Sequence, residues 1–158
     1  MITIGIGELD AARSPDVLVT YALGSCVGIC LLDPITKIAG LAHIMLPSSQ
    51  ELSSSKPSFK FADIAIPALI TKMESMGANR MRIKAKIAGG AKMFATTGEN
   101  SMGNIGARNV TSVKMTLLRN RIPIIAEDIG KDYGRTVYFS SDTGLMQVKS
   151  ALKGENVI

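Results

Sequence analysis

Short apolar runs follow one another through the N-terminal part of the chain with only turn residues between them, and this limits the fold more than any other feature. The runs at residues 17–22 and 27–32 are short and contain β-branched side chains, which is typical of strands. We expect further strands at residues 2–8 and 36–45. Successive strands joined by a tight turn form a hairpin, so the ends of these runs can be neighbours in one sheet.

Two segments further along the chain have the spacing of amphipathic helices. Asp63 is a favourable N-cap for a helix that runs to Met76, and Gly77 is well placed to end it. Asn109 can cap a second helix. The inner face of that helix would carry Val110, Val113, Leu117 and Leu118.

The remaining regular segments, at residues 80–87, 123–127, 136–140 and 145–149, are predicted to be strands, and residues 153–158 a frayed tail. Helices do not alternate regularly with strands, which disfavours a doubly wound parallel sheet and favours an α+β layered fold. A single domain covering residues 1–158 is expected. The serine-rich segment 48–58 has no periodicity and predicts a mobile surface loop, with a lid over a substrate as the alternative.

Basic and apolar residues alternate through Arg80, Arg82, Lys84 and Lys86. A strand with this pattern has one buried face and one cationic face. The cationic face is either a solvated surface that prevents pairing at a sheet edge or a docking stripe for an acidic helix.

A thiol and an imidazole stand near the ends of two predicted strands. Cys26 follows the break Gly24-Ser25, and His43, the single histidine of the chain, lies in the run at residues 36–45. A strand that ends in a glycine turn delivers the next side chain to the rim of a sheet, where a substrate can reach it. An accessible thiol and an imidazole are the minimum for a cysteine hydrolase, although a lone cysteine is more commonly a small core residue.

Cys26 and Cys30 are not expected to form a disulfide. If both lie on one strand, their Cα atoms are ~13 Å apart, and a disulfide needs less than about 7 Å. Two cysteines and one histidine are also too few for a typical structural zinc site. No metal or other cofactor is expected.

Composition narrows the classes of partner and location. The net charge of +5 and the isoelectric point of about 9.4 favour acidic partners. Nucleic acid is disfavoured, because aromatic residues are only 4% of the chain and do not alternate with the basic ones. No apolar run approaches the roughly 20 residues of a membrane span, and the N-terminus lacks the features of a signal peptide. We therefore expect a cytoplasmic protein that does not insert into the membrane.

Five motifs, in order along nearly the whole chain, resemble the chemoreceptor glutamine deamidase family, CheD. They are Leu23-Gly24-Ser25-Cys26-Val27, Ala42-His43-Ile44-Met45-Leu46-Pro47, Lys86-Ile87-Ala88-Gly89-Gly90-Ala91 with Met93-Phe94, Ile105-Gly106-Ala107-Arg108-Asn109, and Gly134-Arg135-Thr136-Val137. One departure is Lys131, which follows Gly130 where the family usually has a second glycine. This departure concerns the shape of a turn and not the chemistry.

The resemblance implies a three-layer α-β-β sandwich with mixed sheets, similar to the catalytic domain of cytotoxic necrotizing factor toxins. It implies hydrolysis of selected glutamine side chains of methyl-accepting chemotaxis receptors to glutamate, with release of ammonia. It also implies a partner, a CheC-type phosphatase of phosphorylated CheY, that competes with the receptor.

The resemblance also implies the roles of three residues. The nucleophile and the base of the family correspond to Cys26 and His43, and Thr20 occupies the place of a strand threonine that completes the triad. His43 can take the thiol proton and form an ion pair, and the attack of Cys26 on the amide gives a thioester that water cleaves. Thr20 would hold the imidazole ring.

Two other interpretations stay open. The first is a non-catalytic adaptor between receptors and phosphatase, and the second is a transglutaminase-like hydrolase of another amide. The complete set of cysteine, histidine and threonine favours an enzyme, because an adaptor needs no thiolate.

Overall fold

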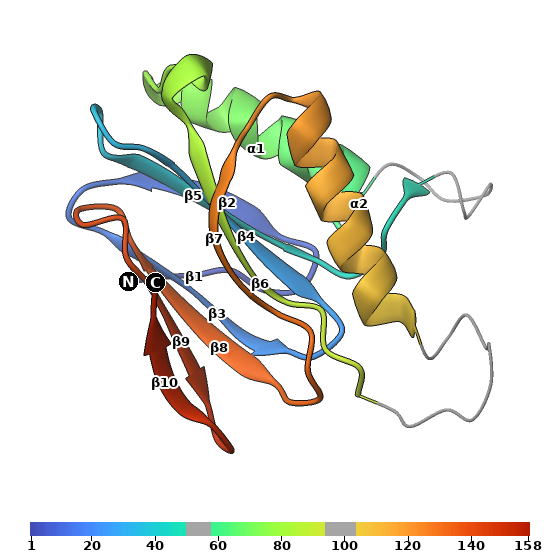
Figure 1. Cartoon of the computed structure of the whole chain (residues 1–158). Coiled ribbons are helices and arrows are strands. Elements are labelled where there is room, and N and C mark those ends of the chain that lie inside the picture. The colour runs from blue at the N-terminus through green and yellow to red at the C-terminus, as the bar shows by residue number, and fades with distance from the viewer. Residues whose placement is uncertain (50–57, 94–103) are drawn as a thin grey trace.

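The computed structural model describes residues 1–49, 58–93 and 104–158, and these residues form two five-stranded sheets and two long helices (Figure 1). In spatial order, sheet A consists of β1 (Ile2–Thr3), β3 (Val17–Leu23), β8 (Arg135–Ser140), β9 (Met146–Ser150) and β10 (Gly154–Val157). Sheet B consists of β2 (Leu9–Arg13), β5 (Ile38–Ile44), β4 (Val27–Asp33), β6 (Lys84–Gly89) and β7 (Ile124–Ile129). Both sheets are mixed, because β1–β3 and β6–β7 pair in parallel and the other strand pairs are antiparallel.

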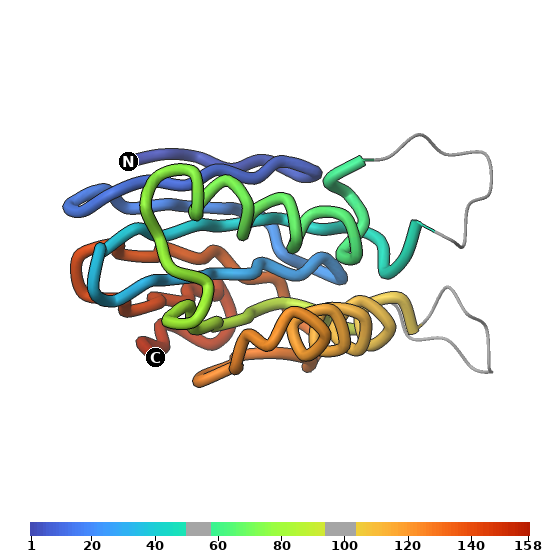
Figure 2. Tube along the Cα trace, turned by 90° about the horizontal axis from the view of Figure 1, so that it is seen from above, coloured from blue at the N-terminus to red at the C-terminus, as the bar shows by residue number. Residues whose placement is uncertain are grey.

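The helices form a third layer on sheet B. Figure 1 shows α1 (Ala62–Met76) and α2 (Ile105–Arg119) on one face of sheet B, with sheet A on the other, and Figure 2 shows both helices on the near side of the strands. α1 packs closely on β5 at Gly40, where an added Cβ would lie 2.7 Å from Cδ1 of Leu69. The expected α+β class is therefore confirmed. No helix within the described ranges is long and apolar enough to cross a membrane.

Successive residues of β4 and β5 serve two separate cores, because side chains alternate between the faces of a strand. Val27 and Ile29 belong to the core between sheet B and the helices. Cys26, Cys30 and Leu41 belong to the core between the two sheets. The alternation thus directs Cys26 toward sheet A, and His43, two residues after Leu41, shares that direction.

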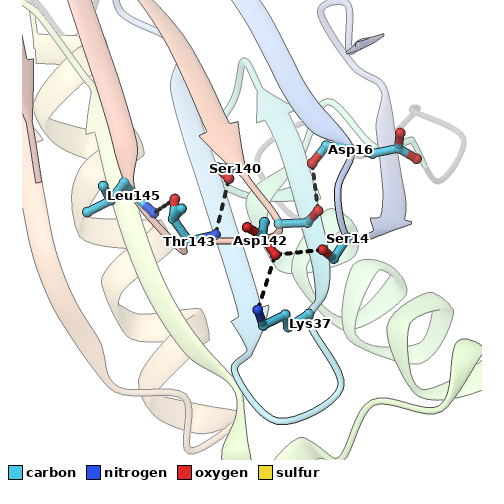
Figure 3. Close-up of polar contacts among 8 residues, drawn as sticks. Ser14, Asp16, Lys37, Ser140, Asp142, Thr143 and Leu145 are labelled. Carbon is cyan, nitrogen blue, oxygen red and sulfur yellow. Dashed lines mark hydrogen bonds and ion pairs between the residues drawn. The ribbon is translucent and has the colours of Figure 1, made fainter.

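Asp142, in the turn after β8, joins the two sheets at the end remote from Cys26. Its carboxylate accepts hydrogen bonds from Oγ of Ser14 at 2.8 Å and from Nζ of Lys37 at 3.1 Å (Figure 3). These hydrogen bonds hold the pKa of Asp142 below its usual value. Since Ser14 and Lys37 flank strands of sheet B and Asp142 follows a strand of sheet A, this contact links the two sheets at that end.

Two predictions near the chain termini are wrong. Residues 2–8 do not form one strand: β1 is short, and β2, which was not predicted, follows and pairs with β5. The supposed frayed tail contains β10, which pairs with β9, and Ile158 exchanges backbone hydrogen bonds of 2.8 and 2.9 Å with Met146. Most of the predicted mobile loop at 48–58 lies outside the described residues.

Both helices begin earlier than predicted. Phe61, not Asp63, is the N-cap residue of α1, and Asp63 lies in the first turn, where its carboxylate accepts two hydrogen bonds from Ser49. α2 begins at Ile105, so Asn109 lies inside the helix and does not cap it. The expected end of α1 at Gly77 is confirmed, with φ of 117° at that glycine.

The predicted strand with a cationic face is confirmed only from Lys84 onward, where β6 exposes Lys84 and buries Ala85 and Ile87. Residues Arg80–Arg82 form a short 3-10 helix, and β6 begins only at Lys84. Arg80 pairs with Glu74, and Arg82 donates two hydrogen bonds, of 2.9 and 2.8 Å, to the buried carboxylate of Asp33. The basic residues therefore do not form one continuous stripe.

The contact between Arg82 and Asp33 has a consequence for stability. Although burial alone would raise the pKa of Asp33, hydrogen bonds from Arg82, Asn79 and Ile35 hold it well below its usual value. We expect Arg82→Glu to lower the melting temperature by several degrees, because it places a second carboxylate beside a buried one. The matched control is Lys37→Glu, which reverses a charge in an ion pair whose partners are both half exposed and should change the melting temperature little. Equal shifts in thermal melts of the two variants would contradict this account.

Candidate active site

Cys26 lies one residue before β4, on the face of sheet B that points toward sheet A. In the ladder between β4 and β5, Gly28 is paired with His43. Cys26 is two residues from Gly28, so its side chain leaves the sheet on the same side as His43 and diagonally across the ladder. An added Cβ at Gly28 would lie 3.2 Å from Cδ1 of Leu23 and 3.7 Å from Cγ2 of Thr20. Glycine at this position therefore keeps the space beside the thiol and the imidazole clear of a further side chain.

The backbone around Cys26 is held by the glycine pair that ends β6. The carbonyl of Cys26 accepts a 2.8 Å hydrogen bond from the N–H of Gly90, and the carbonyl of Gly24 accepts one of the same length from Ala91. Gly89 has φ of +110°, and a Cβ there would lie 2.2 Å from the carbonyl oxygen of Cys26. A side chain at Gly89 would thus displace the backbone at Cys26, which explains why a glycine stands at this point of the motif.

His43 and Thr20 face one another across the gap between the sheets. Oγ1 of Thr20, on β3, lies 2.6 Å from Nδ1 of His43, on β5. The same Oγ1 donates a 2.7 Å hydrogen bond to the carbonyl of Ile4. Both Thr20 and His43 are completely buried. The structure therefore brings together the histidine and the threonine that the sequence singled out.

These two contacts of Thr20 determine the tautomer of His43. A carbonyl oxygen can only accept, so the hydroxyl proton of Thr20 is directed at Ile4. The hydroxyl oxygen must then accept from Nδ1–H of His43, which leaves Nε2 without a proton. The arrangement presents a neutral imidazole whose free lone pair can act as a base.

Burial keeps both the thiol and the imidazole uncharged. It lowers the pKa of His43 to about 4 and raises the pKa of the Cys26 thiol, although the backbone N–H of Cys26 opposes that rise. At neutral pH the pair is therefore a thiol and an imidazole. The expected ion pair is not the state that this environment favours.

The pair is also not joined by a hydrogen bond here. Nε2 of His43 has no hydrogen-bond partner among the described residues. Cys26 is 9% exposed and His43 is not exposed at all, so a substrate reaches the thiol before it reaches the imidazole. Catalytic hydrogen bonds of this kind commonly tighten only when the substrate is bound.

Cys30 provides a contrast on the same strand face. Both cysteines are free thiols, which confirms that no disulfide joins them. Cys30 is completely buried in the core between the sheets, and burial raises its pKa far above the usual value for a thiol. Cys30 is therefore a structural residue, and Cys26 is the thiol that solvent reaches.

Two residues at the site were not found from the sequence. The carbonyl of Ile4 accepts the hydroxyl of Thr20, but a backbone group leaves no signal in residue type. Asn109, predicted to cap a helix, is completely buried and donates from Nδ2 to the carbonyls of Ser25 and Met45. A polar residue on the inner face of an amphipathic helix was the signal that could have identified it.

The described residues offer no metal site, and the groove beside α2 does not include the candidate catalytic residues. No group of three or more histidine, cysteine or acidic side chains in the described ranges could hold a metal ion. A groove of about 590 Å³ lies along α2, beside Pro47 and Asp63, but its lining includes neither Cys26 nor His43. The groove thus lies apart from the candidate chemistry.

Comparison with known proteins places the chain in a family. A sequence model described as CheD chemotactic sensory transduction matches residues 45–150. A probable chemoreceptor glutamine deamidase CheD of Clostridium novyi (strain NT) is 48% identical over 157 residues, which are 99% of this chain and 97% of that protein. The chain belongs to the CheD family.

Other CheD relatives support the same assignment over the full length. A probable chemoreceptor glutamine deamidase CheD of Caldanaerobacter subterraneus is 46% identical over 158 residues, covering 100% of this chain and 98% of the relative. The corresponding protein of Syntrophomonas wolfei is 44% identical with the same coverage. The family resemblance stated from the motifs is thereby confirmed. The family model begins after His43 in the chain, so the roles of Cys26, His43 and Thr20 depend on the geometry described above.

Proposed function

We propose that this CheD protein hydrolyses glutamine side chains of methyl-accepting chemotaxis receptors to glutamate, with Cys26 as nucleophile and His43 as base. The observation that carries the proposal is the contact between Thr20 and His43, which leaves Nε2 unprotonated on the strand face shared with Cys26. The names of the full-length relatives supply the class of substrate, chemoreceptor glutamine.

The first half of the reaction forms a thioester. Sγ of Cys26 attacks the amide carbon, Nε2 of His43 takes the thiol proton, and the electron pair of the carbonyl double bond moves onto oxygen. When the tetrahedral intermediate collapses, His43 returns the proton to the leaving nitrogen and ammonia departs. Because the free thiol and imidazole are both neutral, the proton moves during the attack and not before it.

The second half consumes one water molecule. His43, again neutral, takes a proton from water as its oxygen attacks the thioester carbon. Collapse of this second intermediate expels the thiolate of Cys26, which regains a proton from His43. The products are a glutamate side chain and the original thiol. The N–H of Cys26, which lies near its own sulfur, is the donor that we propose for the oxyanion in both halves.

The proposal is tested with a receptor cytoplasmic fragment, by measuring ammonia and the amide-to-acid mass shift of its glutamines. In water labelled with heavy oxygen, a hydrolase introduces the label into the new glutamate. An adaptor would bind the fragment without releasing ammonia. A transglutaminase-like enzyme would release ammonia but join an added primary amine to the glutamine, and either result would replace the proposed function.

Thr20 should contribute through the tautomer of His43. Thr20→Val keeps the shape of the side chain but leaves Nδ1–H of His43 and the carbonyl of Ile4 without a partner. The tautomer of His43 with a free Nε2 then loses the hydrogen bond that favours it, worth about 1–3 kcal/mol, so we expect kcat to fall roughly ten- to hundredfold with little change in KM. Thr20→Ser retains the hydroxyl and should keep most of the activity. If the serine variant were as slow as the valine variant, the hydroxyl would not be the group that matters.

We propose further that a CheC-type phosphatase binds the rim around Cys26 and competes with the receptor. Support comes from exposed apolar side chains there: Met45 follows His43 and Met93 packs against Gly24. Saturating phosphatase should protect Cys26 from alkylation, and full alkylation in the complex would place the partner elsewhere. We also propose that the fold is similar to the catalytic domain of cytotoxic necrotizing factor toxins, and that the protein acts in the cytoplasm.

A further inference from the structure

Asn109 connects α2 to both strands that carry the proposed catalytic pair. Its Nδ2 donates to the carbonyl of Ser25 at 2.9 Å and to the carbonyl of Met45 at 3.0 Å. Both partners are carbonyl oxygens, so the group that faces them must be the amide nitrogen with its two protons. Asparagine is a weak helix former, and this one is completely buried. Its two contacts, and not helix formation, account for its presence.

The two carbonyls lie on either side of the end of the β4–β5 ladder. Val27 and Ile44 form the last pair, and the next rung would join Cys26 to Met45. Asn109 bridges the strands at this point, one residue before Cys26 and two residues after His43. Asn109 therefore connects the two strand ends just beyond the last pair of the ladder.

The contact with Ser25 also fixes the direction of the next N–H group. Within a planar trans peptide, the C=O of Ser25 and the N–H of Cys26 point in opposite directions. Since the C=O points at Asn109 in α2, the N–H of Cys26 points away from the helix layer. This N–H lies close enough to the Cys26 sulfur to oppose the rise in the pKa of the thiol. The sulfur belongs to the core between the two sheets, so it lies on the side to which the N–H points.

We infer that Asn109 is a positioning residue, which locks the Ser25–Cys26 peptide so that the N–H of Cys26 can hold an oxyanion. The inference depends on the proposed function only in taking Cys26 as the nucleophile. When Sγ bonds to a carbonyl carbon, an electron pair moves onto the carbonyl oxygen, and a donor already aimed at that oxygen stabilises the transition state. A peptide released from Asn109 can rotate and lose that aim.

Two small reagents separate oxyanion support from thiol reactivity. p-Nitrophenyl acetate acylates a thiol through a tetrahedral oxyanion, which collapses to a thioester and p-nitrophenolate. Iodoacetamide alkylates a thiol by direct displacement of iodide, with no oxyanion at the reacting carbon. The ratio of the two rates at Cys26 therefore reports oxyanion support and does not require receptor or deamidation. All proteins carry Cys30→Ala, so that Cys26 is the single thiol.

We expect Asn109→Ala and Asn109→Asp to lower the ratio of acylation to alkylation roughly tenfold or more, approaching the 10²–10³-fold effect of deleting an oxyanion donor. With receptor as substrate, kcat should fall and KM should change little. The matched control is Asn120→Asp, which removes the 2.8 Å hydrogen bond from Nδ2 of Asn120 to the carbonyl of Thr116 at the end of the same helix, and it should leave the ratio unchanged.

The inference fails if the ratio in both Asn109 variants equals the wild-type ratio, or if acylation and alkylation fall by the same factor. Thermal melts show which Asn109 variant is folded at the assay temperature, and the ratio is taken from that variant. Failure of the proposed function gives a different result: wild-type protein would release no ammonia from receptor, whatever the ratio at Cys26.

Discussion

Replacing Cys26 by alanine should abolish release of ammonia from receptor glutamines while the protein stays folded. In the proposed mechanism the sulfur of Cys26 bonds to the amide carbon, and the other thiol, Cys30, is completely buried and cannot replace it. The sulfur is near the surface and takes part in none of the hydrogen bonds that hold its loop, which come from backbone groups and Asn109. Its loss should therefore cost about 1 kcal/mol of stability, as for an average substitution.

Cys30→Ala is the matched control for this result. It removes the same atom from the same strand face, but in the closed core between the sheets. We expect it to lower the melting temperature and to leave the deamidation rate unchanged. Mass spectrometry of the receptor decides the outcome. Conversion by folded Cys26→Ala at the wild-type rate would exclude Cys26 as the nucleophile, and loss of activity in Cys30→Ala would indicate that a folding defect is sufficient.

The central strands could be predicted because their own residues carry the signal. Residues 17–22 and 27–32 are short apolar runs, and β3 and β4 each extend only one residue beyond them. β2 (Leu9–Arg13) was missed because it contains no β-branched or aromatic residue. It is a strand because β5 offers it a partner, and such pairing can override weak local preference.

The beginning of α2 shows a different limit of local reasoning. Asn109 has the chemistry of an N-cap, yet its side chain bonds to carbonyls 84 and 64 residues away in the chain. A residue that is suited to a local role can be used for a distant one. The sequence of a single helix contains no information about which strand ends will lie beside it.

The residues of the candidate site could be predicted from the sequence, but their contacts could not. Cys26 and His43 were candidates from residue type and from their places at strand ends, and Thr20 was added by family resemblance. The contact between Thr20 and His43 forms because β3 of sheet A lies over β5 of sheet B. The continuous basic stripe was wrongly predicted for a related reason. Arg82 pairs with the buried carboxylate of Asp33, and alternation along the chain does not reveal such a distant partner.

Replacing His43 by asparagine should slow deamidation on the order of 10²–10⁴-fold, the usual contribution of a general base. Asparagine can still contact Thr20 but has no basic nitrogen to take the thiol proton. In the proposed mechanism the base is the neutral imidazole of His43, whose pKa burial lowers to about 4. The rate should therefore rise as the pH increases through about 4 and then stay level toward neutral pH. A preformed ion pair would instead require His43 to be charged, and activity would fall once the imidazole lost its proton.

The low pKa of His43 also predicts how the stability of the protein changes with pH, which can be measured separately from activity. Its value in the folded protein, about 4, is below the ordinary 6.5, so the unfolded chain binds the proton more tightly. Stability from this group is complete above about pH 6.5 and is lost as the pH falls toward about 4. Denaturant midpoints measured across this window should fall more in the wild type than in His43→Asn, which has no imidazole to protonate. If both proteins lost stability equally, His43 would not be a buried neutral base, and the proton transfer proposed for it would need another acceptor.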